Sequence, residues 1–311
     1  VGDIGATNAR FALVSAGSSE LNNIQSLKCN KFDNIQKAIS FYLSSMADTK
    51  IHSACFATAG TVHLDTFKLA NNHWTINKSE VASVLKDVDI NWINDFTAQA
   101  LATTTLTDTD VAVINKGIAK PEKLRLVIGP GTGLGVCGLV MTKSGWVPIA
   151  GEGGHSDFAP NTKLEFEILT LLTKKFGHVA VERILSGPGI LNLYEALCQI
   201  NGVDTIFKSP SDITAAAVSK DSNPIAEETI QMFCKIFGSV AGSMALTMGA
   251  LGGVYITSDL VRNFLELFID SDFQQSFENK GRLKPVMENI PIYLSKKENM
   301  GLIGTVYQLN N

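Results

Sequence analysis

The sequence predicts an α/β protein, and three observations support this prediction. Strand-like apolar runs alternate with segments of helical spacing along the whole chain, which is the pattern of α/β proteins. Two distant runs, VGDIGATNARFALV and LRLVIGPGTGLGVCGLV, share one design: an apolar strand, a small turn with Gly and Thr, and a second apolar strand. The chain has 311 residues, which is long for one compact core, so two domains are expected.

The elements of the first third follow from hydrophobic spacing. Each half of VGDIGATNARFALV predicts a strand, and the spacing of Ile35, Ile39, Leu43 and Met46 predicts a helix through FDNIQKAISFYLSSM. HSACFATAG predicts the next strand. NWIN ends a further strand and passes into the predicted helix DFTAQALAT.

The rest of the chain continues the alternation. Helical patterns fill residues 162–201, and 224–248 predicts one long helix in which Gly238 and Gly242 allow close packing. LGGVYIT predicts a buried strand and LVRNFLELF a helix after it. The segments PIYLS and GLIGTVYQL close the chain.

Composition and charge restrict the class of partner. Hydrophobic residues make up 45% of the chain and charged residues 18%, as in ordinary globular proteins. The formal net charge is -4 and no lysine or arginine run occurs, which argues against nucleic acid, because binding a phosphate backbone needs clustered positive charge. A small-molecule ligand is therefore expected.

Cysteine usage and apolar patterning predict a cytoplasmic protein without a membrane span. The five cysteines share no close spacing, which fits reduced thiols better than disulfides or a zinc site: Cys29, Cys55, Cys137, Cys198 and Cys234. The longest apolar stretch, around residues 231–256, contains Lys235 and several Gly and Ser residues, so we expect a buried helix and strand there. No signal peptide is visible, and the sequence begins without methionine inside an apolar run, so further residues are expected before Val1.

The two Gly/Thr turns are candidate phosphate-binding turns. Glycine lets a phosphate approach the backbone, and the backbone amides supply donors. One such turn alone is explained equally well as an ordinary hairpin turn, but two similar turns favour a polyphosphate ligand. Neither is a dinucleotide or Walker loop, because Leu134 stands where the third glycine is needed and no Gly-Lys-Ser/Thr occurs. Asp3, just before the first turn, is a candidate for hydrated Mg2+, although an isolated Asp here is more often a turn residue.

Asn94 and Asp95 form a candidate catalytic pair. They end a strand and begin a helix, where backbone amides keep a carboxylate ionised and able to accept a hydroxyl proton. From the dipeptide alone, a plain helix N-cap is the simpler interpretation.

Two later stretches carry groups suited to polyol binding. In GEGGHSDF, Glu152 and His155 flank two glycines, and a carboxylate and an imidazole can each bridge two hydroxyls. A metal site is not expected, because no cysteine or second histidine lies nearby. In HVAVERILSGPG, Glu182 is expected on an apolar helix, where an ion pair with Arg183 is the alternative to a binding role.

In this order, these motifs resemble the ATP-dependent glucokinases of the enterobacterial type, within the actin-like ATPase superfamily. VGDIGATNARFALV is similar to the family's first phosphate motif, INDFTAQALA to its base-bearing segment, IGPGTGLGV to its second phosphate motif and GEGGHSDFAP to its sugar loop. HVAVERILSGPGILNLY, FENKGRLK and IPIYL also look like family segments, so the resemblance spans almost the whole chain.

The resemblance implies a two-domain actin-like ATPase (ribonuclease H-like) fold with a cleft between a small and a large α/β domain. The small domain would hold residues 1–105 and 296–311, and the large domain residues 106–295. It also implies an enzyme that makes glucose 6-phosphate from glucose and ATP with Mg2+, and a homodimer.

The same resemblance implies a role for each matching residue. Asp95 would be the catalytic base and Asp3 would hold Mg2+ through water. The glucose-binding residues would be Asn71, Asn94, Asp95, Glu152, His155 and Glu182. The ATP-binding residues would be Asp3, Gly5, Ala6, Thr7, Asn8, Gly131, Thr132 and Gly133.

Three departures from the family pattern carry expectations of their own. Ala6 replaces a second glycine, which phosphate tolerates if the local φ is negative. Gly60 stands where close relatives usually have proline. Thr257, Ser258 and Asp259 replace a small glycine-rich turn beside the nucleoside, so their side chains are expected to crowd the adenosine.

Other protein classes lack features found here or need features that are absent. The zinc-binding sugar-kinase and repressor family has a similar Gly-Glu-x-Gly-His element but follows it with a cysteine cluster, which this sequence lacks. An actin-like chaperone or filament protein would share the phosphate turns without needing GEGGH and Glu182. A non-catalytic sugar-responsive protein would keep the sugar residues but tolerate loss of Asp95.

Overall fold

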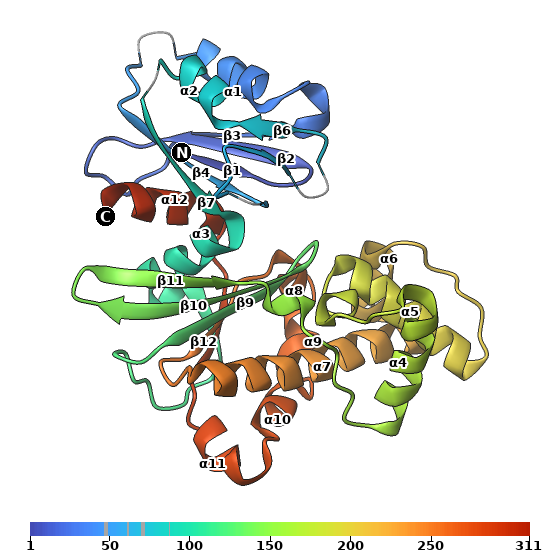
Figure 1. Cartoon of the computed structure of the whole chain (residues 1–311). Coiled ribbons are helices and arrows are strands. Elements are labelled where there is room, and N and C mark those ends of the chain that lie inside the picture. The colour runs from blue at the N-terminus through green and yellow to red at the C-terminus, as the bar shows by residue number, and fades with distance from the viewer. Residues whose placement is uncertain (47–48, 61, 70–71, 87) are drawn as a thin grey trace. The chain divides into compact units, whose positions relative to one another are not determined.

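The computed structural model describes residues 1–46, 49–60, 62–69, 72–86 and 88–311 (Figure 1). The chain divides into two compact units. Unit 1 comprises Val1–Thr107, Thr142–Ala150 and Lys297–Asn311, and unit 2 comprises Asp108–Met141 and Gly151–Lys296. Each unit has its own sheet, helices and hydrophobic core.

Unit 1 is built on a sheet with the strand order β3-β2-β1-β4-β7. Its strands are β1 (Gly2–Ile4), β2 (Asn8–Leu13), β3 (Asn22–Lys28), β4 (Ser53–Thr58) and β7 (Asp89–Asn94). β1 pairs antiparallel with β2 and parallel with β4, and β4 pairs parallel with β7. Three parallel strands therefore end at one edge of this sheet.

Helices and a small hairpin complete unit 1. They are η1 (Cys29–Lys31), α1 (Ile35–Ser44), β5 (Thr66–Lys68), β6 (Thr75–Asn77), α2 (Lys78–Val84), α3 (Asp95–Ala102), η2 (Thr103–Thr105) and α12 (Met300–Asn310), with most of β11 (Gly145–Gly151). α12 packs tightly on α3. A Cβ on Gly304 would lie only 1.7 Å from the Ala98 carbonyl oxygen, so glycine is needed for this contact. The last helix of the chain thus belongs to the same unit as the first strand.

The six-stranded sheet has the order β11-β10-β9-β12-β13-β8, and the five strands after β11 belong to unit 2. They are β8 (Val111–Asn115), β9 (Arg125–Pro130), β10 (Leu134–Thr142), β12 (Val254–Ile256) and β13 (Ile292–Ser295). Its α-helices are α4 (Lys163–Phe176), α5 (Gly187–Asn201), α6 (Pro210–Val218), α7 (Pro224–Met248), α8 (Asp259–Arg262), α9 (Leu265–Ile269), α10 (Phe273–Glu278) and α11 (Lys284–Met287). Short 3-10 turns are η3 (Asp108–Asp110), η4 (Gly153–His155), η5 (Val181–Arg183) and η6 (Gly281–Leu283).

The long helix α7 begins and ends where its sequence signals predict. Asn223 caps it by accepting from the Ala226 amide, Pro224 occupies the first turn, and Gly249 ends it in the left-handed region with φ 65°. A Cβ on Gly238 would lie 2.0 Å from the Phe273 carbonyl oxygen, so the predicted close packing is confirmed, against α10. Within the described residues α7 is the one helix long and apolar enough to span a membrane, and 61% of its most apolar window is buried inside the protein.

Two predicted helices differ in the structure. LVRNFLELF is not one helix, because Phe264 leaves the helical conformation (φ -133°, ψ 38°) and separates α8 from α9. Its side chain is buried and makes an edge-to-face contact with Phe233, with ring centroids 5.9 Å apart, so core packing overrides helix continuity there. Glu182 lies on the single 3-10 turn η5 rather than on an α-helix. All five cysteines are free and buried.

Candidate active site

The first predicted phosphate turn is the hairpin turn between β1 and β2. The Gly5 amide donates to the Asn8 carbonyl at 3.0 Å and closes the turn. Gly5, Ala6 and Thr7 do not have positive φ, so alanine at position 6 is accommodated without backbone strain. The Ala6 amide has no hydrogen-bond partner among the described residues and is available to a ligand.

Asp3 lies on β1, just before this turn, against the first turn of α12. A Cβ on Gly301 would lie 2.5 Å from the Asp3 Cγ, so only glycine leaves room for the carboxylate. The Asp3 side chain is 16% exposed, and Arg10 Nη1 lies 3.4 Å from its Oδ2. The start of a helix favours negative charge, which suits an ionised carboxylate here.

Asn94 and Asp95 occupy the junction of β7 and α3, as predicted. The Asn94 Oδ1 accepts from the Phe96 amide at 2.9 Å and the Thr97 amide at 3.1 Å, so Asn94 is the N-cap of α3. Asp95 is the first residue of α3, and its Oδ1 accepts from the Phe96 amide at 2.8 Å. Both side chains are partly exposed, so the capping role of Asn94 leaves its amide nitrogen able to donate to a ligand.

Strand register places the turn and Asp95 at the same edge of the unit 1 sheet. Ile4 on β1 pairs with Thr58 on β4, which pairs with Asn94 on β7. Gly5 directly follows Ile4, and Asp95 directly follows Asn94. Neighbouring strands in a sheet lie about 4.8 Å apart. The first phosphate turn and the candidate base therefore stand about two strand spacings apart. Asn71 lies outside the described residues.

The second predicted phosphate turn joins β9 to β10 in unit 2. The Gly131 amide donates to the Gly133 carbonyl at 2.8 Å, and the Gly131 carbonyl accepts from the Gly187 amide at 2.8 Å. Gly131 and Thr132 are exposed. The Thr132 amide has no partner among the residues the structure describes, so this turn also offers a backbone donor.

Glu182 lies beside this second turn, and His155 lies next to Glu182. The Glu182 Oε1 lies 3.8 Å from His155 Nδ1, and a Cβ on Gly133 would lie 2.7 Å from the Glu182 Oε2. A Cβ on Gly154 would lie 2.3 Å from the Leu134 carbonyl oxygen, so the glycines bring the loop 151–155 against β10. Glu152 and His155 are both exposed.

Glu182 is not paired with Arg183, which was the alternative left open by the sequence. Arg183 instead stacks over the Phe176 ring at 4.8 Å, and the ion pair that the structure records for Glu182 is with His155. The 3-10 geometry of η5 turns these neighbours in different directions. The carboxylate is thereby left beside the phosphate turn and the imidazole.

The three residues that replace the family's glycine-rich turn do not all project outward. Thr257 and Ser258 are each 5% exposed, and Ser258 Oγ donates to the Pro130 carbonyl at 2.6 Å while accepting from the Val261 amide at 3.1 Å. Only Asp259 is exposed, where it pairs with Arg262. Gly60 has φ 154°, which proline does not adopt.

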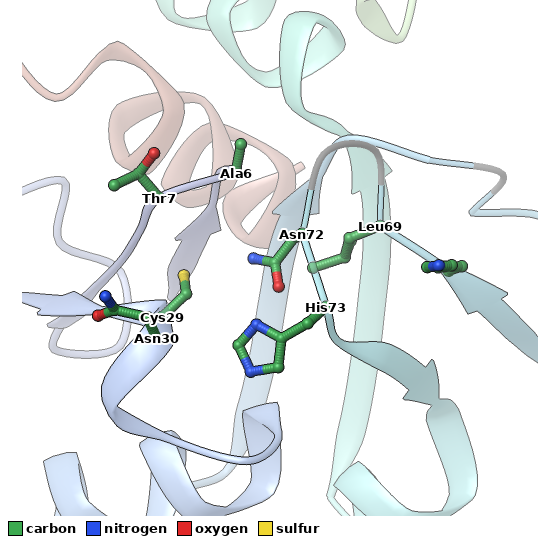
Figure 2. A pocket seen from close by; sticks show the side chains of 8 residues that line it. Ala6, Thr7, Cys29, Asn30, Leu69, Asn72 and His73 are labelled. Atoms are coloured by element: carbon green, nitrogen blue, oxygen red, sulfur yellow. The ribbon is translucent and has the colours of Figure 1, made fainter.

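Sequence reasoning missed two residues beneath the first turn. A cavity of about 380 Å³ is lined by Ala6 and Thr7 on one side and by Cys29, Asn72 and His73 on the others (Figure 2). Asn72 Nδ2 donates to the Gly5 carbonyl at 3.1 Å, and Cys29 Sγ lies 3.7 Å from the same oxygen. Neither residue belongs to a recognisable motif; the only signal was that Asn72 follows the singled-out Asn71.

The residues near the first turn fit a magnesium ion that arrives with a polyphosphate. Among the described residues, no group of three or more His, Cys, Asp or Glu side chains is placed to hold a metal. Mg2+ in such sites uses one or two carboxylates together with phosphate oxygens and water, so the single carboxylate of Asp3 suffices on the protein side.

Comparison with known proteins gives one family along the entire chain. The family model described as Glucokinase matches residues 1–311. A glucokinase of Hahella chejuensis is 48% identical over 311 residues, covering 100% of this chain and 96% of that protein. A glucokinase of Marinobacter nauticus is 43% identical, covering 100% and 97%. A solved glucokinase structure from an Antarctic psychrotroph has a TM-score of 0.88 at 33% identity, covering 100% of this chain and 98% of that one.

Proposed function

Because the chain belongs to the glucokinase family, we propose that it transfers the γ-phosphoryl group of ATP to the 6-hydroxyl of glucose, forming glucose 6-phosphate and ADP. The register of β1, β4 and β7 is the observation that carries this proposal at residue level. It puts a backbone donor turn and an acid at the end of the same sheet. Phosphoryl transfer needs both within reach of one substrate.

Asp95 is the base in this mechanism. Its Oδ1 is held by the Phe96 amide at the start of α3, which favours the ionised form and fixes the carboxylate direction. An ionised, oriented carboxylate can accept the proton that leaves the sugar hydroxyl as that oxygen attacks phosphorus. Asp95 then acts only as a base, and no covalent intermediate forms on the protein.

Sugar recognition falls to groups that bridge hydroxyls. Asn94 offers its amide nitrogen, while Glu152, His155 and Glu182 offer carboxylate and imidazole groups around the loop 151–155. Several such contacts fix the sugar in one orientation, which makes an in-line approach of the 6-hydroxyl frequent. Asn71 is retained as a further sugar-side residue from the family resemblance.

Phosphate binding falls to the two turns. Gly5, Ala6, Thr7 and Asn8 form one donor surface and Gly131, Thr132 and Gly133 the other, and both expose an amide with no partner in the described part of the chain. Mg2+ bound with the nucleotide near Asp3 would supply charge neutralisation for the phosphate oxygens. Backbone amides spread the remaining charge without adding competing side-chain acids or bases.

The wider setting of the reaction is part of the same proposal. Residues 1–105 with 296–311 would form the small domain and 106–295 the large domain, with the substrates held in a cleft between them. Closure on glucose would exclude water as a competing acceptor. We also propose a homodimer, as the family resemblance implies, and a cytoplasmic location, which the free cysteines support.

Two other functions are less well supported. An actin-like ATPase needs the turns and Asp3 but gains nothing from the contact between Glu182 and His155. A non-catalytic sugar-responsive protein has no use for an acid oriented at the sheet edge. A coupled assay of ADP release with and without glucose separates all three, because only the kinase shows glucose-dependent release.

Replacing Asp95 by asparagine tests the base directly. Asp95→Asn keeps the size and the contact with the Phe96 amide but removes the proton acceptor, so we expect kcat to fall by about 10³-fold with glucose affinity within threefold. Glucose affinity is measured by calorimetry and kcat by the coupled assay. Asp89→Asn, at the exposed opposite end of β7, is the matched control and should behave like the parent. A kcat near normal for Asp95→Asn would remove Asp95 from the base role.

A further inference from the structure

We propose that Asn72 is a positioning residue that orients the Ala6 amide toward the phosphates of the bound nucleotide. The inference rests on the proposed function and deepens it. It assigns a role to a residue that lies outside every motif of the phosphate turn. Asn72 acts through the Gly5 carbonyl rather than by touching the nucleotide.

The contact between Asn72 and the turn is specific and buried. Asn72 is 9% exposed, its Nδ2 donates to the Gly5 carbonyl at 3.1 Å, and its Oδ1 accepts from the Trp74 amide at 2.9 Å. Figure 2 shows the side chains of Asn72 and Cys29 pointing toward one another across the pocket below Ala6. Both ends of the Asn72 amide are therefore used, and its orientation is fixed.

The segment that carries Asn72 is itself firmly held. Trp74 is 1% exposed, and its indole Nε1 donates to the Phe32 carbonyl at 2.9 Å. His73 Nε2 lies 3.0 Å from the same oxygen. Two neighbours thus anchor the segment to Phe32, which directly follows η1, so Asn72 presents its donor to Gly5 from a fixed position.

The geometry of one peptide unit connects this contact to the ligand. A trans peptide is planar, and its C=O and N–H point in opposite directions. The Gly5 carbonyl and the Ala6 amide belong to the same unit, so holding the carbonyl toward Asn72 points the amide away from the protein side of the turn. Glycine at position 5 would otherwise let this unit rotate at low cost.

Cys29 gives the same oxygen a weaker contact. Its Sγ lies 3.7 Å from the Gly5 carbonyl, and burial raises the pKa of this thiol, so it remains protonated at neutral pH and can donate. A thiol is a weak donor compared with an amide. Loss of the Asn72 donor therefore removes most of the restraint on the Gly5–Ala6 unit.

Asn72→Asp tests the proposal with a minimal change. The aspartate keeps an acceptor for the Trp74 amide but removes the donor and sets a carboxylate oxygen against the Gly5 carbonyl, which turns the peptide unit away. We expect KM for MgATP to rise about tenfold and Kd for MgADP, measured by calorimetry, to rise by the same factor. The Kd for glucose and the melting temperature should change little by comparison.

Asn72→Ala provides a second variant, because it removes both hydrogen bonds without adding charge and should weaken MgADP binding in the same direction. His73→Ala is the matched control: it removes one of the two contacts with the Phe32 carbonyl but keeps the buried Trp74 contact and the Asn72 donor, so its MgADP affinity should stay within twofold of the parent. MgADP affinity within twofold of the parent in whichever Asn72 variant folds would overturn the proposal. MgADP calorimetry does not depend on turnover, so a parent enzyme without glucose-dependent ADP release would refute the proposed function and leave this test intact.

Discussion

The two turns that we propose to bind phosphate are held in different ways. In unit 1 the Gly5 carbonyl is held by the side chain of Asn72, and in unit 2 the Gly131 carbonyl is held by the backbone amide of Gly187. By the planarity of the peptide unit, the first contact fixes the Ala6 amide and the second fixes the Thr132 amide. The first turn therefore depends on a side chain that mutation can remove. The second depends on a backbone amide at the start of α5, which no truncation of a side chain removes.

The difference teaches where each turn is vulnerable. No single side-chain deletion removes the Gly187 contact, whereas Asn72→Asp removes the corresponding contact in unit 1. The second turn is instead sensitive to added bulk, because Gly133 lies directly against Glu182. Loss of a donor should damage the first turn, and gain of a methyl group the second.

Gly133→Ala should have the largest effect on this comparison. The new Cβ would lie 2.7 Å from the Glu182 Oε2, so the carboxylate must shift from its position beside His155. We expect kcat/KM for glucose to fall about 100-fold, since small misplacements of a binding group cost this much, and KM for ATP to rise as well. Steady-state kinetics in both substrates measures the two effects.

Gly151→Ala is the control for that variant, because a Cβ there meets nothing within 4 Å and Gly151 is not among the proposed phosphate-binding residues. Its φ is not positive, so backbone strain is not expected either. Similar losses of glucose kcat/KM in the two variants would show that crowding against Glu182 is not the cause.

Ser258→Ala should have an intermediate effect on the second turn. It removes the hydrogen bond to the Pro130 carbonyl and the N-cap of α8, so the free energy of unfolding should fall by about 1–2 kcal/mol and KM for ATP rise a few-fold. Denaturant unfolding and ATP titration check these values. Thr257→Val is the matched variant: the Thr257 Oγ1 is buried without a partner among the described residues, so replacing it by a methyl should cost no stability. A larger loss in Thr257→Val than in Ser258→Ala would contradict this assignment.

The smallest expected effect is on stability at alkaline pH, where one buried thiol in each unit can be compared. Burial raises the pKa of Cys55 in β4 to about 12 and that of Cys234 in α7 to about 12, from the ordinary cysteine value of 9.0. Between these pH values the unfolded chain loses thiol protons that the folded chain keeps, so stability falls as pH rises, by about 1.4 kcal/mol per pH unit for each thiol. Cys55→Ala and Cys234→Ala, each measured by denaturant unfolding in the presence of a reductant, should each reduce the slope of stability against pH by about 1.4 kcal/mol per pH unit. A slope unchanged by either variant would show that other groups dominate alkaline unfolding.

Patterns within a few residues could be predicted, and contacts between distant segments could not. The Gly/Thr turns, the long helix α7 and the strand-to-helix junction at Asp95 are written locally, in spacing and capping residues. Phe264 interrupts its helix because the buried ring contacts Phe233, and that packing has no local signal. The role of Asn72 could not be predicted for the same reason, since its partner Gly5 lies 67 positions earlier in the chain.

The side-chain direction of Thr257 and Ser258 shows the same limit. The sequence suggested that both side chains would crowd the nucleoside, but both are buried, and Ser258 donates to the Pro130 carbonyl just before the second turn. The direction of a side chain at the end of a strand depends on the neighbouring strand that it contacts. Here that neighbour is β9, whose Pro130 is far away in sequence.

The placement of α12 has a consequence for how the protein is made. Gly301 and Gly304 seat this helix against Asp3 and Ala98, so residues from the beginning of the chain wait for residues 297–311 before their packing is complete. Most of unit 2 is one continuous stretch, 151–296, that leaves the ribosome earlier. During synthesis most of unit 2 can fold first, and the edge of the unit 1 sheet that carries Asp3 and Asp95 is completed only when α12 has emerged. A ribosome that stalls before residue 300 therefore leaves a chain with loop 151–155 already made and the sheet edge of Asp3 and Asp95 still unpacked.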